Sequence, residues 1–209
     1  MTIRIIEFDP HTASDELWAA FNETRRVIAH EFWPDEPILD DAETRREVQT
    51  TNPMVEFRRW VAMEGDKVAG SIRAAFRRPG TPDEKDYARF LWAGGGVRAS
   101  SRRRGAGTLL LREVHQLMHA LDKTVLTMSA QTELGHAFIK HVGAVEKHTP
   151  KGVQVALLFL FFHKRLCGPL ANSRFHHCPD THHKPASKLE AAYHRADKAI
   201  QQIVDLLAA

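Results

Sequence analysis

The stretch from Phe90 to Met118 constrains the fold of this chain more than any other. It opens on an apolar run, passes through three consecutive glycines at 94–96 and a basic segment at 97–108, and then turns apolar again. The later apolar residues recur at helical spacing and are Leu109, Leu110, Leu111, Val114, Leu117 and Met118. This order predicts a strand, a tight turn and an amphipathic helix.

The turn before the predicted helix has the properties of an anion site. A helix N-terminus presents free backbone N–H groups and the positive end of the helix dipole, and both favour phosphate. Gly105 and Gly107 allow the backbone to approach a ligand closely, and Arg102, Arg103 and Arg104 are suited to pair with phosphate oxygens. We therefore predict that a phosphate-bearing ligand binds here. The spacing is neither that of the dinucleotide-binding motif nor that of a P-loop.

The same stretch resembles the Gcn5-related N-acetyltransferases, whose pattern is Val-x-Pro-x-x-Arg-x-x-Gly-x-Gly followed by a helix. This chain reads Val97-x-Ala99-x-x-Arg102-x-x-Gly105-x-Gly107, with Ala99 in place of the common proline. The resemblance implies an α/β fold with a mixed, mostly antiparallel sheet flanked by helices. It also implies acetyl-CoA as cosubstrate.

The resemblance assigns two parts of a cofactor site. In the family, the fourth strand bulges and splays from the fifth, and the pantetheine arm lies in the gap. Backbone N–H groups near the bulge polarise the thioester, here at Gly96, Val97 and Arg98. The pyrophosphate is expected on the turn, which comprises Arg102, Arg103, Arg104, Gly105, Ala106, Gly107 and Thr108.

The rest of the chain is similar to this family in the order of its predicted elements. Strands are expected at 3–8, 57–63, 68–76, 87–97, 124–129, 145–148 and 153–162, with the glycines at 94–96 breaking the fourth. A first helix is expected to end at Phe32 and to be capped by Thr12 or Ser14, and further helices are expected at 43–49, 104–121 and 133–142, the last capped by Gly143. An exposed loop is expected at 77–86.

No catalytic acid or base can be assigned from the residues. The family's usual proton donor is a tyrosine, and Ile139 stands at that place, while Tyr87 and Tyr193 lie elsewhere. Other side chains able to move a proton are Ser129, Glu133, His136 and His141. Each of these also has an ordinary interpretation as a structural or solvated side chain. Positioning of the reactants can itself supply a large part of a barrier.

Four acidic residues follow the first predicted helix, namely Asp35, Glu36, Asp40 and Asp41. In the family this region helps to form the acceptor site, so the segment is compatible with a cationic amine. The alternative is an ordinary solvated loop.

The composition shifts after residue 162, which divides the chain into three predicted parts. Residues 1–162 form the acetyltransferase-like domain, 163–186 a linker and 187–209 an amphipathic C-terminal helix. This helix is expected to pack on the domain or on a second subunit, as in a homodimer. The linker carries zinc-ligand residue types, but their spacing matches no standard finger, and we predict no metal site; they are His176, His177, Cys178, His182 and His183.

The composition limits the partners. The net charge of +3, from 29 basic and 26 acidic residues, argues against nucleic acid, and the apolar run at 156–162 is too short to span a bilayer. Two cysteines, Cys167 and Cys178, and a short polar start predict a reducing, cytoplasmic location without a signal peptide.

Three functions remain open at this point. The first is N-acetyl transfer from acetyl-CoA to a primary amine of a small molecule or peptide. The second is a non-catalytic module that binds acyl-CoA. The third is a nucleic-acid-binding module that uses the arginines at 102–104, whose electrostatic footprint is small.

Overall fold

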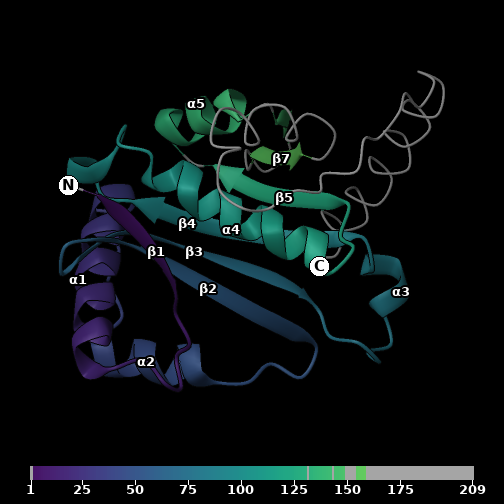
Figure 1. Ribbon diagram of the computed structural model, residues 1–209, viewed down its shortest axis with the longest axis horizontal. Coiled ribbons are helices and arrows are strands. Elements are labelled where there is room, and N and C mark those ends of the chain that lie inside the picture. The colour runs from purple at the N-terminus through teal and green to yellow at the C-terminus, as the bar shows by residue number, and fades with distance from the viewer. Residues whose placement is uncertain (1, 131, 143, 149–153, 159–209) are drawn as a thin grey trace.

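The computed structural model describes residues 2–130, 132–142, 144–148 and 154–158. Its strands form a seven-stranded sheet in the order β1-β2-β3-β4-β5-β7-β6 (Figure 1). The strands are β1 (Ile3–Glu7), β2 (Val55–Glu64), β3 (Lys67–Arg77), β4 (Phe90–Val97), β5 (Val125–Ala130), β6 (Val145–His148) and β7 (Gln154–Leu158). β4 and β5 are parallel, and the other neighbours in the sheet are antiparallel. The predicted mixed, mostly antiparallel sheet is confirmed.

Helices lie on both faces of the sheet. They are α1 (Asp15–Phe32), α2 (Asp41–Gln49), α3 (Glu84–Tyr87), α4 (Ala106–Ala120) and α5 (Glu133–His141), with a 3-10 turn, η1 (Ala99–Ser101), before α4. α1 packs on the face of the sheet that carries Phe8 and Val61, and α4 packs on the opposite face, which carries Trp60 and Leu91. Figure 1 shows α1 and α2 together on one side of the sheet, away from α4.

Apolar spacing and a polar cap account for these two helices. Ser14 caps α1 by accepting a hydrogen bond from the Leu17 N–H at 3.3 Å. The apolar stripe of α4 is buried to 2% exposure or less at Leu110, Leu111, Val114 and Met118. Each such side chain stabilises the fold by about 1.5–3 kcal/mol. The stripe thereby fixes α4, and with it the preceding turn, against the sheet.

β4 is continuous, which corrects the prediction that its glycines break it. Its register with β3 runs without a shift from Trp92 to Val97. Gly95 makes this possible, because a Cβ there would lie 2.1 Å from the backbone oxygen of Ser71 on β3. The lack of a side chain at Gly95 therefore allows β3 and β4 to approach each other closely. A second correction concerns 77–86, where the expected loop leads into α3.

Several predictions fall on residues that the structure does not describe. They are the Gly143 cap, the last part of the strand expected at 153–162, the linker at 163–186 and the helix at 187–209. Within the described ranges, no helix is long and apolar enough to cross a membrane. The same part of the chain holds no group of three or more metal-ligating side chains.

Candidate functional site

β4 and β5 separate at the glycines. Their pairing runs from Phe90 to Ala93 of β4 and ends there, whereas β3 stays paired with β4 as far as Val97. From Gly94 onward, β4 therefore has an open edge on the side of β5 among the described residues. This is the separation of the fourth and fifth strands that the family resemblance implies.

Alternation along β4 decides which N–H groups face this gap. The Arg98 N–H donates to the Ala69 oxygen of β3 at 2.9 Å, so Gly96, two residues earlier, also turns its N–H toward β3. The N–H groups of Gly95 and Val97 consequently point toward the open edge. Of the three residues expected to polarise a thioester, Val97 thus has its N–H at the open edge, whereas the N–H groups of Gly96 and Arg98 face β3. Gly95 was not among the predicted residues, and its N–H faces the same edge as that of Val97.

The turn between β4 and α4 presents a second set of N–H groups. Arg103 and Gly105 have positive φ angles of 60° and 90°, and the first helical hydrogen bond runs from the Leu109 N–H to the Gly105 oxygen at 3.0 Å. Gly105 caps α4 without a side-chain hydrogen bond. The six N–H groups from Arg103 to Thr108 have no acceptor within the described part of the chain. Such an array at a helix N-terminus is a ready site for an anion.

Two of the predicted arginines are engaged by carboxylates of α1. Arg98 forms an ion pair with Glu23 at 3.1 Å, and Arg102 forms one with Glu31. The Arg102 Nε also donates to the Val97 oxygen at 3.0 Å. These contacts join the turn to α1 and to the end of β4.

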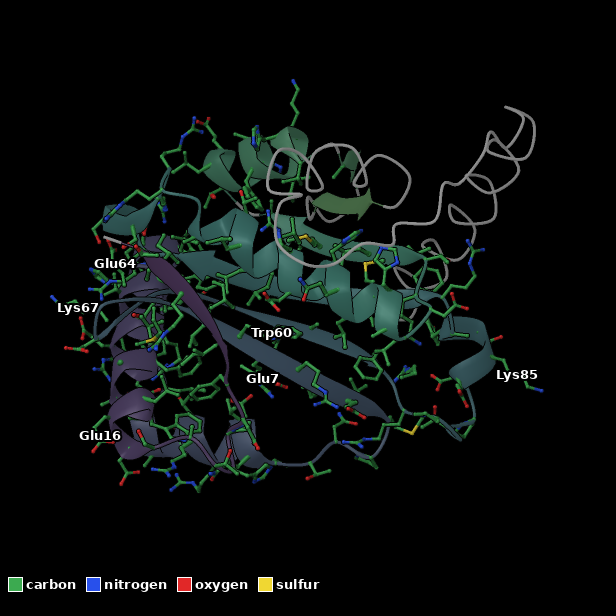
Figure 2. All side chains as sticks on the ribbon, in the orientation of Figure 1. Glu7, Glu16, Trp60, Glu64, Lys67 and Lys85 are labelled. Carbon is green, nitrogen blue, oxygen red and sulfur yellow. The ribbon has the colours of Figure 1, made fainter. Side chains whose placement is uncertain are left out.

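A third arginine is held by the end of β2. Arg104 pairs with Glu64, and the Ser101 hydroxyl donates to the other Glu64 oxygen at 3.0 Å. Figure 2 shows Glu64 at the end of the sheet where α4 begins. Arg103, by contrast, is exposed and forms no ion pair with a described residue. It is the arginine of this turn that is available to a ligand without breaking an existing pair.

Gly107 has a structural role as well as its place in the predicted site. A Cβ there would lie 3.4 Å from the ring of Phe138 on α5 and 3.8 Å from the Val97 side chain. These are ordinary contact distances, so alanine fits at this position. A larger side chain would press on α5, which packs on the same face as α4.

Among the described residues around α5, none stands out by its position as a general acid or base. Ile139 is buried at 3% exposure against Ala130, and His136 is half-buried on the same helix. The other proton-carrying candidates are exposed, namely Ser129, Glu133 and His141. Tyr87 lies in α3, with its ring centroid 5.7 Å from that of Trp92. Tyr193 lies outside the described residues.

Half of the acidic segment is engaged within the fold. Asp40 caps α2 by accepting from the Glu43 N–H at 2.6 Å. Asp41 pairs with Arg26 and, at 3.2 Å, with Arg25. The hydrogen bond from Arg26 lowers the pKa of the Asp41 carboxyl below its ordinary value. These two carboxylates therefore stabilise the junction of α1 and α2.

The comparisons with known proteins identify the family. The sequence pattern of the acetyltransferase (GNAT) family matches residues 17–143, and the chain belongs to this family. Its members are acyl-transferring enzymes. A search of curated proteins found no match.

Solved structures share the fold at low sequence identity. A tandem GNAT protein from the clavulanic acid biosynthesis pathway is 21% identical to this chain, with a TM-score of 0.57. The alignment covers 70% of this chain and 45% of the tandem protein, so this chain spans less than half the length of the tandem protein. PaiA N-acetyltransferase from Thermoplasma acidophilum, solved with coenzyme A, is 12% identical with a TM-score of 0.56, covering 77% of this chain and 100% of that one. An aminoglycoside 6'-N-acetyltransferase complexed with coenzyme A is 17% identical with a TM-score of 0.51, covering 74% and 94%.

Proposed function

We propose that this protein transfers an acetyl group from acetyl-CoA to a primary amine of a small molecule or peptide. The observation that carries the proposal is the array of six N–H groups from Arg103 to Thr108, which stands beside the open edge of β4. The pyrophosphate of CoA would accept hydrogen bonds from this array and pair with Arg103. The ordered loop around Arg102 and Arg104 would need little rearrangement to receive it.

The open edge of β4 supports the chemistry. With the pantetheine arm along this edge, the N–H groups of Gly95 and Val97 can donate to the thioester oxygen. The amine nitrogen attacks the carbonyl carbon, negative charge develops on the oxygen, and the carbon–sulfur bond then breaks. The amine loses a proton and the CoA thiolate gains one. Removing one such donor in an enzyme typically costs about 2.7–4 kcal/mol of barrier.

The second candidate function is a module that binds acyl-CoA without turnover, and the burial of Ile139 favours it. An aliphatic side chain at this position cannot protonate a leaving thiolate, and a binding module needs no proton donor there. We infer an enzyme whose rate depends mainly on positioning and on the β4 N–H groups. In such an enzyme, the proton lost by the amine and the proton gained by the thiolate pass through water or through one of the polar side chains near α5.

Release of free thiol separates the two functions. The purified chain is incubated with acetyl-CoA and a panel of primary amines, and CoA is measured with a thiol reagent against a sample without amine. An enzyme releases CoA in step with the acetylated amine, whereas a binding module binds CoA and releases none.

A matched pair of variants tests the assignment of the phosphate site. We expect Arg103→Gln to raise the KM for acetyl-CoA by about 10- to 100-fold, the effect of losing a charge-assisted hydrogen bond. Arg4, another exposed arginine without an ion pair among the described residues, lies on β1, and Arg4→Gln should leave this KM unchanged. Equal effects of both substitutions would contradict the assignment.

A further inference from the structure

Two arginines lie side by side on the face of the sheet that carries α1 and α2. Arg59 of β2 and Arg73 of β3 are direct cross-strand partners. Their guanidinium carbons lie 5.0 Å and 5.9 Å from the centroid of the same ring, that of Phe57. Neither arginine forms an ion pair with any residue that the structure describes.

This arrangement is costly without a counter-ion. Like charges directly opposite each other on neighbouring strands destabilise a sheet. Arg59 is partly buried, and burial followed by the charge of Arg73 lowers the pKa of its guanidinium below the ordinary value. An anion placed between the two guanidinium groups would offset both effects. The pair therefore has the charge and the geometry of an anion-binding site.

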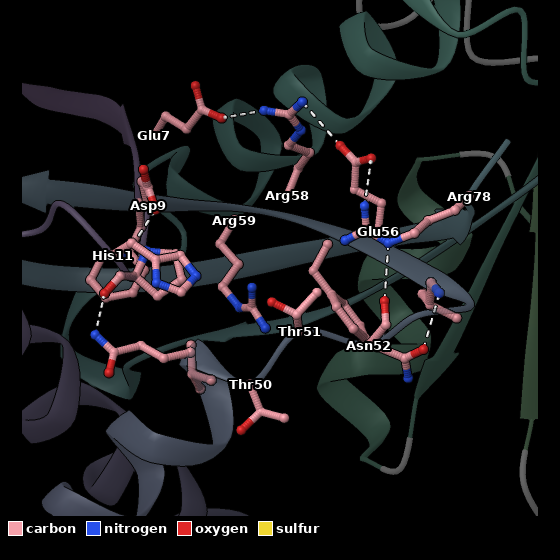
Figure 3. A pocket seen from close by; sticks show the side chains of 16 residues that line it. Glu7, Asp9, His11, Thr50, Thr51, Asn52, Glu56, Arg58, Arg59 and Arg78 are labelled. Carbon is pink, nitrogen blue, oxygen red and sulfur yellow. Dashed lines mark hydrogen bonds and ion pairs between the residues drawn. The ribbon is translucent and has the colours of Figure 1, made fainter.

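A cavity of about 560 Å³ lies beside Arg59, bounded by the end of β1, the end of α2 and the first residues of β2. Figure 3 shows the Arg59 side chain pointing into this hollow between His11 and Thr51.

The carboxylates that line the cavity are already engaged. Glu7 and Glu56 pair with Arg58 at 3.4 Å and 3.0 Å. Asp9 accepts hydrogen bonds from the His11 N–H at 2.9 Å and from the Thr12 hydroxyl at 3.0 Å. None of these carboxylates neutralises Arg59, so the cavity can admit an anionic group to it.

The arginine pair is in register with the predicted reaction centre. Arg73 is the cross-strand partner of Gly94, the first residue of β4 beyond the pairing with β5. The space above Gly94 is open, because a Cβ there would meet no atom within 4 Å. Neighbouring strands are about 4.8 Å apart, so the Cα of Arg59 lies roughly 10 Å from that of Gly94. One small molecule, with the arginine side chains reaching toward it, can span the distance from Arg59 across Arg73 to Gly94.

We propose that Arg59 and Arg73 bind an anionic group, a carboxylate or a phosphate, of the acceptor whose amine is acetylated at the open edge of β4. The inference rests on the proposed function and adds the class of its acceptor. It differs from the cationic acceptor that the acidic segment suggests, because Asp40 and Asp41 are engaged within the fold. The acceptor is thus an amine that carries a negative charge at its other end.

Paired acceptors test the proposal by turnover. Glycine, β-alanine and 4-aminobutyrate are compared with ethylamine, propylamine and butylamine, which replace the carboxylate by a methyl group. We expect at least one carboxylate member to exceed its partner about tenfold in kcat/KM. Arg59→Gln and Arg73→Gln should each lower kcat/KM for that member by about 10- to 100-fold and leave its alkylamine partner within twofold. Arg4→Gln is the control, and it should change neither.

A binding measurement decides the matter even where no pair turns over. The arginine Nε–H signals are followed by NMR while CoA-saturated protein is titrated with glutarate or with inorganic phosphate. Joint shifts of Arg59 and Arg73 with one dissociation constant support the proposal, and a response to phosphate alone assigns a phosphate-bearing acceptor. Shifts no larger than those of Arg4 overturn it, as does faster turnover of alkylamines or diamines. A failure to bind CoA in the same samples would instead count against the proposed function.

Discussion

A methyl group added at Gly95 should damage the fold, whereas the same group at Gly94 should not. The Cβ of Gly95→Ala would lie 2.1 Å from the Ser71 oxygen and 2.7 Å from the Ile72 Cα, and both obstacles are backbone atoms. Ordinary contact begins at 3.4 Å, so β3 and β4 must move apart by about 1.3 Å. Overpacking of this kind costs about 1–3 kcal/mol or more, and each ladder hydrogen bond that is lost adds about 1 kcal/mol.

Chemical and thermal unfolding measure this difference. We expect Gly95→Ala to lose roughly 3 kcal/mol, which for a chain of this size lowers Tm by about 6–12 °C. Gly94→Ala should stay within about 1 kcal/mol of the original protein, because its methyl group enters open space and alanine suits a strand better than glycine. Its effect should appear instead as a lower rate with amines at unchanged CoA affinity. Equal stability of the two variants would show that the close approach of β3 and β4 does not require glycine at position 95.

Three further predictions concern the rest of the fold. The Thr24 hydroxyl donates to the Val68 oxygen at 2.6 Å in a buried position, so Thr24→Val should cost about 1–3 kcal/mol in urea unfolding and Thr24→Ser clearly less. Burial raises the pKa of the Glu113 carboxyl above its ordinary value of 4.5. The charged carboxylate therefore destabilises the folded state above the raised pKa, and this effect is absent below the ordinary value. Glu113→Gln should be more stable than the original protein near pH 7, and the gain should vanish as the pH falls toward 4. Gly107→Ala should bind CoA as before, whereas Gly107→Val should disturb both CoA binding and stability because it presses on Phe138.

The elements that depend on local pattern were predictable from the sequence. The apolar stripe of α4, a polar cap before α1 and the two strands on either side of Gly65 each follow from residues near one another in the chain. The continuity of β4 does not, because it depends on how closely β3 approaches Gly95. Three consecutive glycines favour a break unless a neighbouring strand is known to require them.

The turn that is proposed to bind phosphate was predictable in position, but the contacts of its side chains were not. The spacing of Arg102, Gly105 and Gly107 located the turn, yet the partners of its arginines are Glu23, Glu31 and Glu64, which lie far away in sequence. Their acidic character alone gave no signal of this pairing.

The arginine pair on the sheet was missed for the same reason. The pairing of Arg59 with Arg73 depends on the register of the β2–β3 hairpin. Counting outward from the turn at Gly65 would place Arg59 opposite Ile72, because an irregularity between Ala62 and Met63 shifts the register by one residue. The sequence gives no signal of that shift, so the pair could not be predicted from it.

The backbone from Arg103 to Thr108 is proposed to bind the pyrophosphate of CoA. Backbone amide NMR signals of the full chain, followed during titration with CoA and separately with pantetheine, test it most directly. We predict that the amide protons of these six residues move downfield with CoA and hardly move with pantetheine, because only CoA carries the phosphates. Those of Gly95 and Val97 should respond to both ligands, because both carry the arm that we propose to lie along β4. CoA binding that leaves the amide signals of Arg103–Thr108 in place would show that the pyrophosphate binds elsewhere.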